Sequence, residues 1–304
     1  MSVAVVKRKV VNGKAYFYLQ HTVRAGRRVA TREKYLGSKL PKDLEEVKAR
    51  FLAEVYGEKW FPLLDAIRDN FASEERKLPK SAVEKQVQGF SVKFTYDSNR
   101  MEGGKLSLRE TADLLERGLA QASKPVADVK EAEAHEKVFY EVLGYGKDLT
   151  LDAVLYWHGE LFKATKPDIA GKVRGHQVKI SGSKFLPPSP AEIPALLKEF
   201  FSWYHGAKGK LHPVELAALT HLKLVTIHPF ADGNGRISRL AMNFVLHRKG
   251  FPLLSIPYEN RGSYYHALER AQTKKNESVF VHWLYRRYVK EYGKYAKKPE
   301  AISK

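Results

Sequence analysis

Residues 228–239 bring together side chains that suit the chemistry of phosphate groups. The run reads His-Pro-Phe-Ala-Asp-Gly-Asn-Gly-Arg-Ile-Ser-Arg. His228 is a proton acceptor that titrates near neutral pH, and Asp232 offers the hard carboxylate oxygens that Mg²⁺ prefers. Where a new helix is expected to begin, backbone N–H groups can converge on an anion, aided by the helix dipole. The residues at that start are Gly233, Asn234 and Gly235.

Two arginines, Arg236 and Arg239, follow at positions i and i+3 of the expected helix, and Asn243 extends this polar stripe by another turn. Guanidinium groups bind phosphate oxygens through paired N–H donors. Each feature alone has an ordinary explanation, because Asp-Gly-Asn-Gly is usually a turn and an arginine pair is usually a solvated face. Their combination within twelve positions predicts a pocket that binds a magnesium–triphosphate chain.

This run resembles the signature of the Fic family, His-x-Phe-x-Asp/Glu-Gly-Asn-Gly-Arg-x-x-Arg, at every fixed position, and the resemblance extends over about residues 87–285. It implies a protein adenylyltransferase in which His228 deprotonates a Ser, Thr or Tyr hydroxyl of a target protein. That oxygen would attack the α-phosphate of ATP and release pyrophosphate. The resemblance also implies that Asp232 holds Mg²⁺ and that the two arginines hold the β- and γ-phosphates.

One position separates two branches of this family. A phosphorylating branch carries Lys where this sequence has Gly235, so the resemblance favours transfer of AMP over transfer of phosphate. Two alternatives stay open. One keeps the same pocket but uses a different nucleotide or phosphate donor. The other is a nucleic-acid-binding regulator, in which the basic N-terminal segment grips the partner and the Fic core only senses a nucleotide.

Two further segments resemble parts of the family's nucleotide site. Residues 171–188 are similar to the flap that lies over the active site, and their glycines and β-branched residues favour a short β-hairpin. Ser181 and Gly182 of this flap would lie near the nucleotide. On the adenine side the resemblance points to Tyr265 and to Gln272, which stands where the family pattern has Asn.

The segment 98–103, Ser-Asn-Arg-Met-Glu-Gly, resembles the family's inhibitory motif. Glu102 stands just before two glycines, where a helix is expected to end. A carboxylate there opposes the helix dipole, so a tertiary partner would have to stabilise it. The resemblance supplies Arg239 as this partner and Ser98 as its companion, which implies self-inhibition at the γ-phosphate position. The same glutamate could also support removal of AMP.

The first 42 residues predict strands and carry an unusual charge. Asn12-Gly13 separates two apolar runs and predicts a hairpin turn, because both turn residues must take positive φ. Ala25-Gly26 predicts a second turn. Residues 1–42 hold eleven Lys or Arg and a single acid, Glu33. This surface could bind nucleic acid or another anionic partner, or its lysines could simply protect a sheet edge from strand addition.

From residue 43 onward the spacing of apolar residues predicts helices, one of which opens with a capping box at Ser107 and continues to about residue 121. We therefore expect a mainly α fold, a Fic-type helical bundle with a small β-hairpin flap, preceded by a small basic β-rich segment. The expected parts are the β-rich segment 1–42, a helical linker region 43–86 with a polar loop at 72–86, the core 87–290 with the inhibitory helix near 90–102, and a basic tail 291–304.

The 304 residues carry a net charge of +19, which favours an acidic or phosphate-bearing partner. The absence of cysteine excludes disulfides, a cysteine nucleophile and thiolate metal sites. No run reaches the roughly 18 apolar residues of a membrane span, and the start lacks the features of a signal peptide, so we expect a cytoplasmic protein without a membrane partner. The expected partners are ATP and a hydroxyl-bearing protein, including the protein itself, with a homodimer left open.

Overall fold

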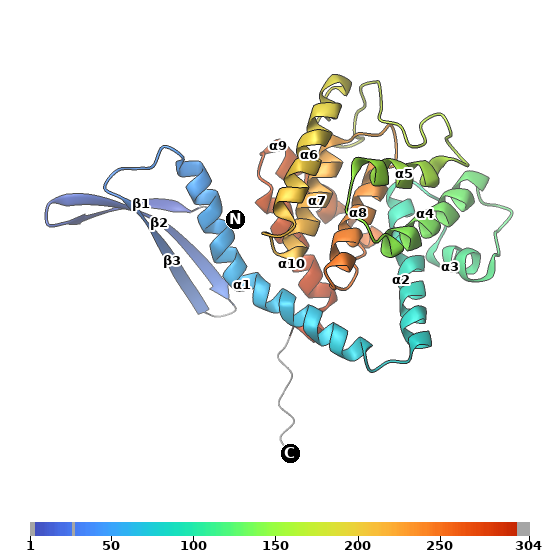
Figure 1. Ribbon diagram of the computed structural model, residues 1–304, viewed down its shortest axis with the longest axis horizontal. Helices are drawn as coiled ribbons and strands as arrows, with labels where there is room; N and C mark the ends of the chain where they lie inside the picture. Colours follow the sequence, from blue (N-terminus) through green and yellow to red (C-terminus); the bar gives the residue numbers. More distant parts are fainter. Residues whose placement is uncertain (1–3, 26–27, 297–304) are drawn as a thin grey trace, which may run out of the picture. The chain divides into compact units, whose positions relative to one another are not determined.

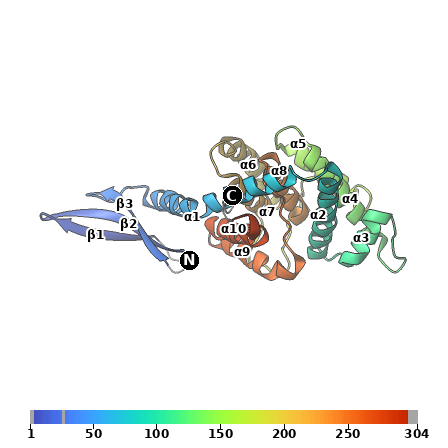
Figure 2. The same ribbon diagram turned by 90° about the horizontal axis from the view of Figure 1, so that it is seen from below.

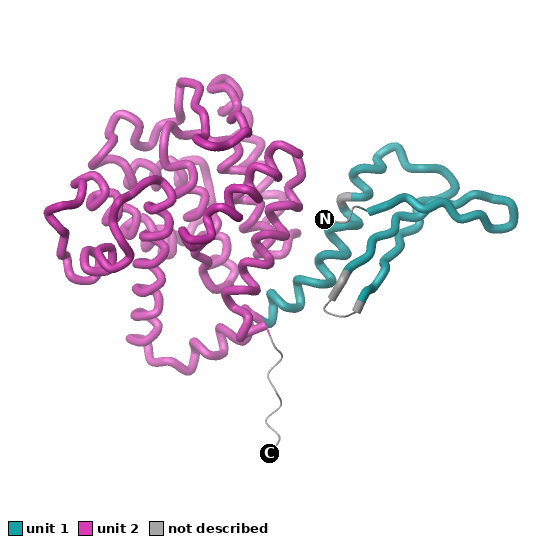
Figure 3. The backbone as a smooth tube through the Cα atoms, turned by 180° about the vertical axis from the view of Figure 1, so that it is seen from behind, with its two compact units in different colours: residues 1–66 teal, residues 67–304 magenta. Residues whose placement is uncertain are grey.

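The computed structural model describes residues 4–25 and 28–296. The chain forms two compact units, residues 1–66 and 67–304, which Figure 3 shows in different colours. The smaller unit combines a sheet with one helix, and the larger unit is built from helices (Figure 1). No helix among the described residues is long and apolar enough to cross a bilayer.

The sheet of the smaller unit has three antiparallel strands in the order β1-β2-β3. Their bounds are β1 Val5–Val11, β2 Lys14–Ala25 and β3 Arg28–Gly37. Asn12 (φ 49°) and Gly13 (φ 74°) take left-handed conformations between β1 and β2, which confirms the predicted hairpin turn. The second expected turn, Ala25-Gly26, includes Gly26, which lies outside the described residues.

Helix α1, Leu44–Glu75, begins in the smaller unit and ends in the larger one. Near its start, Phe51 and Val55 are buried against Leu19 of β2, which has no exposed surface. A sheet of three strands needs such a partner, because an isolated small sheet buries too little apolar area to be stable. One face of the sheet is therefore covered by α1.

The larger unit is mainly helical, as predicted. Its helices are α2 Lys80–Met101, α3 Leu108–Arg117, α4 Val126–Gly144, α5 Leu151–Phe162, α6 Ile193–Ala207, α7 Pro213–Ile227, α8 Asn234–Arg248, α9 Arg261–Thr273 and α10 Ser278–Glu291. Helix α7 packs against α6, α8 and α10. Most residues of α7 are buried, as expected for a helix that is apolar on nearly every side. Most residues of α8 are buried as well, including the arginines of its polar stripe.

Two helix ends differ from the sequence-based expectation. Helix α3 opens with the predicted capping box at Ser107 but stops at residue 117 rather than near 121, because Gly118 takes a left-handed conformation (φ 69°). The polar loop expected at 72–86 is reduced to residues 76–79. Helix α1 continues to Glu75, and Pro79 directly precedes α2. Polar residues alone therefore did not interrupt these helices.

The flap differs from the predicted β-hairpin: residues 171–188 form a loop with turns and no paired strands. The physical reason lies in Arg174, which is 4% exposed and donates to His176 O (2.7 Å) and Pro188 O (2.6 Å). A side chain thus uses carbonyl groups that a strand ladder would need. Pro187 and Pro188 in addition have no N–H to donate.

Asn243 of α8 is fully buried and fixes the chain that follows this helix. Its Nδ2 donates to Leu254 O (3.0 Å), and Leu254 N donates to Asn243 Oδ1 (2.8 Å). Both backbone polar groups of a buried residue are therefore satisfied by one side chain. The polar stripe that the sequence predicted on α8 is turned into the protein at this position.

We predict that Asn243→Leu lowers the free energy of unfolding by about 2–4 kcal/mol, because it leaves two buried backbone groups unpaired. Urea denaturation followed by circular dichroism measures this change. Gln121→Leu replaces an exposed amide and serves as the control, with an expected change below about 0.5 kcal/mol. Equal losses in the two variants would contradict the assigned role of Asn243.

Candidate active site

His228 is positioned by the end of helix α7. The helix ends at Ile227, and His228 takes a left-handed conformation (φ 52°, ψ 56°) before Pro229. His228 Nδ1 lies 3.2 Å from Val225 O, which assigns the proton to Nδ1 and leaves Nε2 as the acceptor. Burial lowers the pKa of His228 below its usual value, so the ring is neutral at pH 7.

The loop that follows His228 is held in one shape by its own side chains. Asn234 accepts a hydrogen bond from Phe230 N (2.9 Å) and donates one to Phe230 O (2.8 Å), so its amide is committed to the backbone of the loop. The Phe230 ring is 1% exposed and stacks on the His158 ring at 3.8 Å between centroids. His158 Nε2 also lies 3.1 Å from Asp232 O.

Gly233 and Gly235 permit approaches that a larger residue would block. Gly233 has a φ of 78°, and a Cβ at this position would overlap the Phe162 ring. A Cβ on Gly235 would overlap Glu102 Oε1 and would lie 2.9 Å from Arg239 Nη1. The first N–H groups of α8 have no acceptor within the helix. Together with the helix dipole they make this helix start suitable for an anion.

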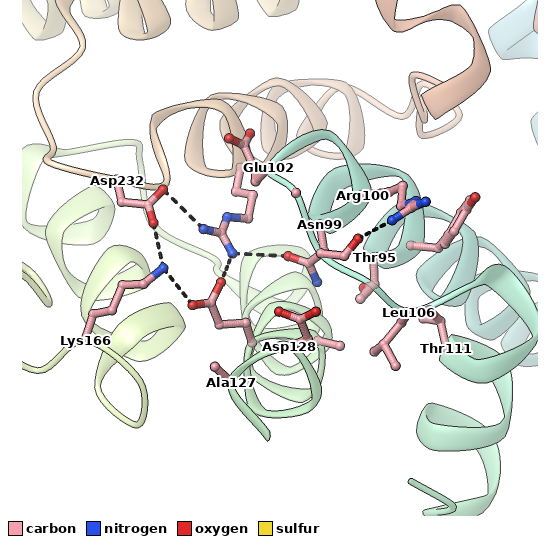
Figure 4. Close-up of a pocket in the computed structure, with 16 residues that line it drawn as sticks. Thr95, Asn99, Arg100, Glu102, Leu106, Thr111, Ala127, Asp128, Lys166 and Asp232 are labelled. Carbon is pink, nitrogen blue, oxygen red and sulfur yellow. Dashed lines mark hydrogen bonds and ion pairs between the residues drawn. The ribbon is translucent and has the colours of Figure 1, made fainter. Parts of the chain in front are cut away.

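Arg236 is 1% exposed and is bound by several segments. It forms an ion pair with Glu131 of α4, contacts Asp232 at 3.4 Å and donates to Asn99 Oδ1 at 3.2 Å. The Lys166 ammonium adds a second cation, 2.7 Å from Asp232 Oδ2 and 2.9 Å from Glu131 Oε1. Figure 4 shows Lys166 and Asp232 pointing toward each other. Burial raises the pKa of Asp232, but the charges of Arg236 and Lys166 outweigh it and the carboxylate stays ionised.

These side chains border a cavity of about 170 Å³ next to the end of α2 (Figure 4). No three His, Asp or Glu side chains of the described residues are placed to bind a metal together. Asp232 nevertheless suits Mg²⁺, which usually takes one or two carboxylates and fills its remaining positions with phosphate oxygens and water. To reach Asp232, a divalent cation would have to displace the Lys166 ammonium.

Arg239 is 1% exposed and is bound by the end of α2. Its Nε donates to Ser98 Oγ at 3.1 Å, and its Nη2 donates to Ser98 O at 3.1 Å and to Glu102 Oε1 at 2.9 Å. The Glu102 side chain keeps 28% of its surface exposed and lies against Gly235. The end of α2 therefore places a carboxylate directly at the anion-binding start of α8.

The two residues expected on the adenine side both belong to α9. The hydroxyl of Tyr265 donates to Met101 O at 3.2 Å, next to Glu102. Gln272 Nε2 donates to Thr226 Oγ1 at 3.1 Å, near the end of α7. Both side chains therefore bind segments next to residues 228–233, which we call the signature loop. Neither of these two hydrogen bonds is made to the loop itself.

Ser181 and Gly182 lie in the flap, where Gly182 takes a φ of 73°. The flap is joined to α9 shortly after them, since Lys184 N donates to Glu269 Oε2 at 2.9 Å. The flap start is joined to the signature loop by Arg174, whose backbone N donates to Pro229 O (2.9 Å). This segment thus connects α9 with the loop that carries the histidine.

Three charged residues of this site were not found by sequence reasoning: Arg174, Glu131 and Lys166. Each is a single charge with a partner in a distant segment of this site, and no local spacing marks it. Arg174 Nε, for example, donates to His228 O at 2.9 Å. Glu131 had the clearest available signal, because it directly precedes the buried Ala132 on α4. A charge beside the apolar stripe of a helix indicates a buried partner.

A model of the Fic/DOC family matches residues 148–246. Among curated proteins, the protein adenylyltransferase Fic of Drosophila melanogaster is 37% identical over 180 residues, which cover 58% of this chain and 36% of the relative. The corresponding protein of Nematostella vectensis is 35% identical over 181 residues, with coverages of 58% and 42%. The chain therefore spans well under half the length of these two relatives.

Solved structures share the helical fold. A Fic domain containing signaling protein from Bacteroides thetaiotaomicron gives a TM-score of 0.69 at 27% identity, covering 79% of this chain and 99% of that chain. Fic-1 from C. elegans also gives a TM-score of 0.69, at 25% identity and with coverages of 84% and 77%. The similarity thus extends well beyond the residues matched by the family model.

We predict that His228 titrates below pH 6.5 in the folded protein, because burial disfavours the charged ring. The folded state then binds fewer protons than the unfolded state, so this residue lowers the free energy of unfolding as the pH falls below about 6.5. NMR titration of the imidazole C–H signal measures the midpoint, and His228→Asn assigns that signal. A midpoint at or above pH 6.5 without urea would contradict the expectation.

We predict that Lys166→Met tightens the binding of Mn²⁺ to the nucleotide-free protein about tenfold, because Asp232 and Glu131 lose the ammonium with which the metal competes. Electron paramagnetic resonance of free Mn²⁺ measures this affinity independently of activity. Lys163→Met removes the same charge from an ion pair with Glu160 and is the control. Unchanged affinity in Lys166→Met would show that Asp232 is not the metal ligand.

Proposed function

The chain is a Fic/DOC family protein, and on this premise we propose that it is a protein adenylyltransferase, which transfers AMP from ATP to a Ser, Thr or Tyr hydroxyl of a target protein. One observation carries the proposal. A neutral imidazole acceptor, His228, stands at one end of a rigid loop, and an anion-binding helix start stands at the other. This arrangement pairs a proton acceptor with a phosphate site within a few residues.

In the proposed reaction, His228 Nε2 takes the proton of the target hydroxyl while the hydroxyl oxygen attacks the α-phosphorus of ATP. The bond between this phosphorus and the bridging oxygen breaks, and pyrophosphate leaves with its electron pair. The N–H groups at the start of α8 and the Arg239 guanidinium neutralise negative charge on the phosphates. Asp232 would hold Mg²⁺, which supplies further charge neutralisation at the phosphates.

Gly235 supports transfer of AMP rather than phosphate, because no lysine side chain stands at this position. The base of the nucleotide would lie between the flap and α9. Ser181 and Gly182 would contact it from the flap, and Tyr265 and Gln272 from the helix. The bond between Lys184 and Glu269 supports this arrangement, since it joins the two segments.

Glu102 is the internal inhibitor in this proposal. Its carboxylate accepts a hydrogen bond from the guanidinium of Arg239. Without Glu102, this guanidinium would bind the end of the triphosphate. A phosphate that approaches the same group meets a negative charge already paired there. Ser98 holds the guanidinium from its other side, and the Tyr265 hydroxyl fixes the end of α2. The nucleotide must therefore compete with a carboxylate of the same chain.

We predict that Glu102→Gly increases the transfer of AMP at least tenfold, because the Arg239 guanidinium becomes available to phosphate. The measurement compares ATP labelled on the α-phosphate with ATP labelled on the γ-phosphate, incubated with Mg²⁺, the purified protein and a cell lysate. Mass spectrometry then identifies the modified side chains. Glu102→Gly/His228→Ala is expected to lose the label.

The control for this comparison is Glu116→Gly, which removes an exposed carboxylate from the last turn of α3 and is expected to behave like the wild type. Label from the γ-phosphate would assign the protein to phosphate transfer. Persistent α-label in the double variant would remove His228 from the mechanism.

A further inference from the structure

The sheet of the smaller unit has one covered and one uncovered face. On the covered face, Leu19 packs against α1. Residues paired across antiparallel strands share a face, and the register pairs Lys7 with Tyr18, Lys9 with Tyr16, and Tyr18 with Tyr35. These residues alternate with Leu19 along β2, so they lie on the face opposite α1. The uncovered face therefore combines tyrosines with lysines.

The tyrosines of this face form a cluster in which Tyr35 is exposed and Tyr16 and Tyr18 are half-buried. The rings of Tyr18 and Tyr35 lie 5.3 Å apart, those of Tyr16 and Tyr35 lie 6.2 Å apart, and Lys9 Nζ stands 4.6 Å above the Tyr18 ring. Tyr35 keeps 56% of its surface exposed. The solvent face of an antiparallel sheet is normally polar. Exposed aromatic rings there indicate an interaction surface.

Cations of the β1–β2 hairpin are left without acidic partners. Residues 7–18 contain four Lys or Arg and no acid. Lys7, Arg8 and Lys14 are exposed, and within the described part of the chain no carboxylate forms an ion pair with them. This excess positive charge is complementary to a polyanion.

The lysines and arginines on the α1 side of β3, in contrast, form ion pairs with acidic residues of α1. Arg32 pairs with Glu58 at 2.7 Å, and Lys34 pairs with Glu54 at 3.1 Å. The helix thus neutralises the cations on its own side of the sheet. Protection of a sheet edge explains lysines on β1, but it does not explain Tyr18, which lies on the central strand and is paired on both sides.

The hairpin also extends beyond the third strand. The pairing of β3 with β2 stops at Phe17, whereas β1 pairs with β2 as far as Lys14, so residues 9–16 form a two-stranded ribbon (Figure 2). The major groove of B-form DNA, about 12 Å wide, admits a two-stranded ribbon. The deep and narrow major groove of A-form RNA does not. The shape of the ribbon and the positive charge of the hairpin therefore both favour B-form DNA as the partner.

We propose that this face binds double-stranded DNA, with the β1–β2 ribbon in the major groove. Lys7 and Lys14, which lie on this face by the register, contact phosphates, and the hydroxyls of Tyr16 and Tyr35 add hydrogen bonds to the backbone. This surface is separate from the adenylyltransferase site, since all its residues belong to the first 37 of the chain. It gives the protein a second activity that does not depend on the first.

The test is fluorescence anisotropy of the full chain with a labelled 20-base-pair duplex at several salt concentrations. For Lys7→Ala/Lys14→Ala we expect the dissociation constant to rise roughly tenfold near 0.1 M salt, and the slope of log affinity against log salt to flatten by about 0.9 per lost contact. Lys147→Ala/Lys198→Ala removes the same charge from exposed positions of the larger unit and is expected to bind like the wild type.

Three results would overturn the proposal. They are equal weakening in the two double variants, equal competition by heparin or by the single strand of the same sequence, and no binding of the full chain at 0.1 M salt. Heparin competition would assign the face to polyanions in general rather than to a duplex. Thermal melting by circular dichroism confirms that each variant is folded, which is expected because all the replaced side chains are exposed.

Discussion

Two buried guanidinium groups at the start of α8 need acidic and hydrogen-bonding partners, and the fold of the larger unit has to supply them. Arg236 and Arg239 are each 1% exposed. A buried charge is strongly unfavourable unless it is paired and hydrogen-bonded. The end of α2, helix α4 and the signature loop supply these partners, which are Ser98, Asn99, Glu102, Glu131 and Asp232. The fold must therefore bring segments that are distant in sequence to one helix end.

The two arginines differ in how readily their partners can be exchanged. The acidic partner of Arg236 on α4, Glu131, is 13% exposed and is held in addition by Lys166. Arg236 also stacks over the Phe162 ring at 4.7 Å. The acidic partner of Arg239 has a side chain that is 28% exposed and stands at the end of a helix. We therefore interpret Arg236 as the anchor of the loop and Arg239 as the group on which a phosphate can replace a carboxylate.

The smaller unit is organised by a different constraint. A three-stranded sheet with one helix has two faces, and only one of them is needed for a core. The other face can carry side chains that are not part of this core, here Tyr16, Tyr18 and Tyr35 with their neighbouring lysines. Composition alone left edge protection and anion binding as equal explanations of the charge. The register places these tyrosines with Lys7 and Lys9 on one face, and our proposal of DNA binding is based on this grouping.

Patterns within a few residues were sufficient to predict the turn at Asn12-Gly13, the capping box at Ser107 and the loop that starts at His228. In each of them the groups that interact are neighbours in the chain, so their spacing records the interaction. The loop conformation of the flap and the partners of Arg236 were decided only by the tertiary structure. Arg174, Glu131 and Lys166 bind a carbonyl and charges that belong to other segments. Local spacing does not record which distant segment will supply a buried group with its partner.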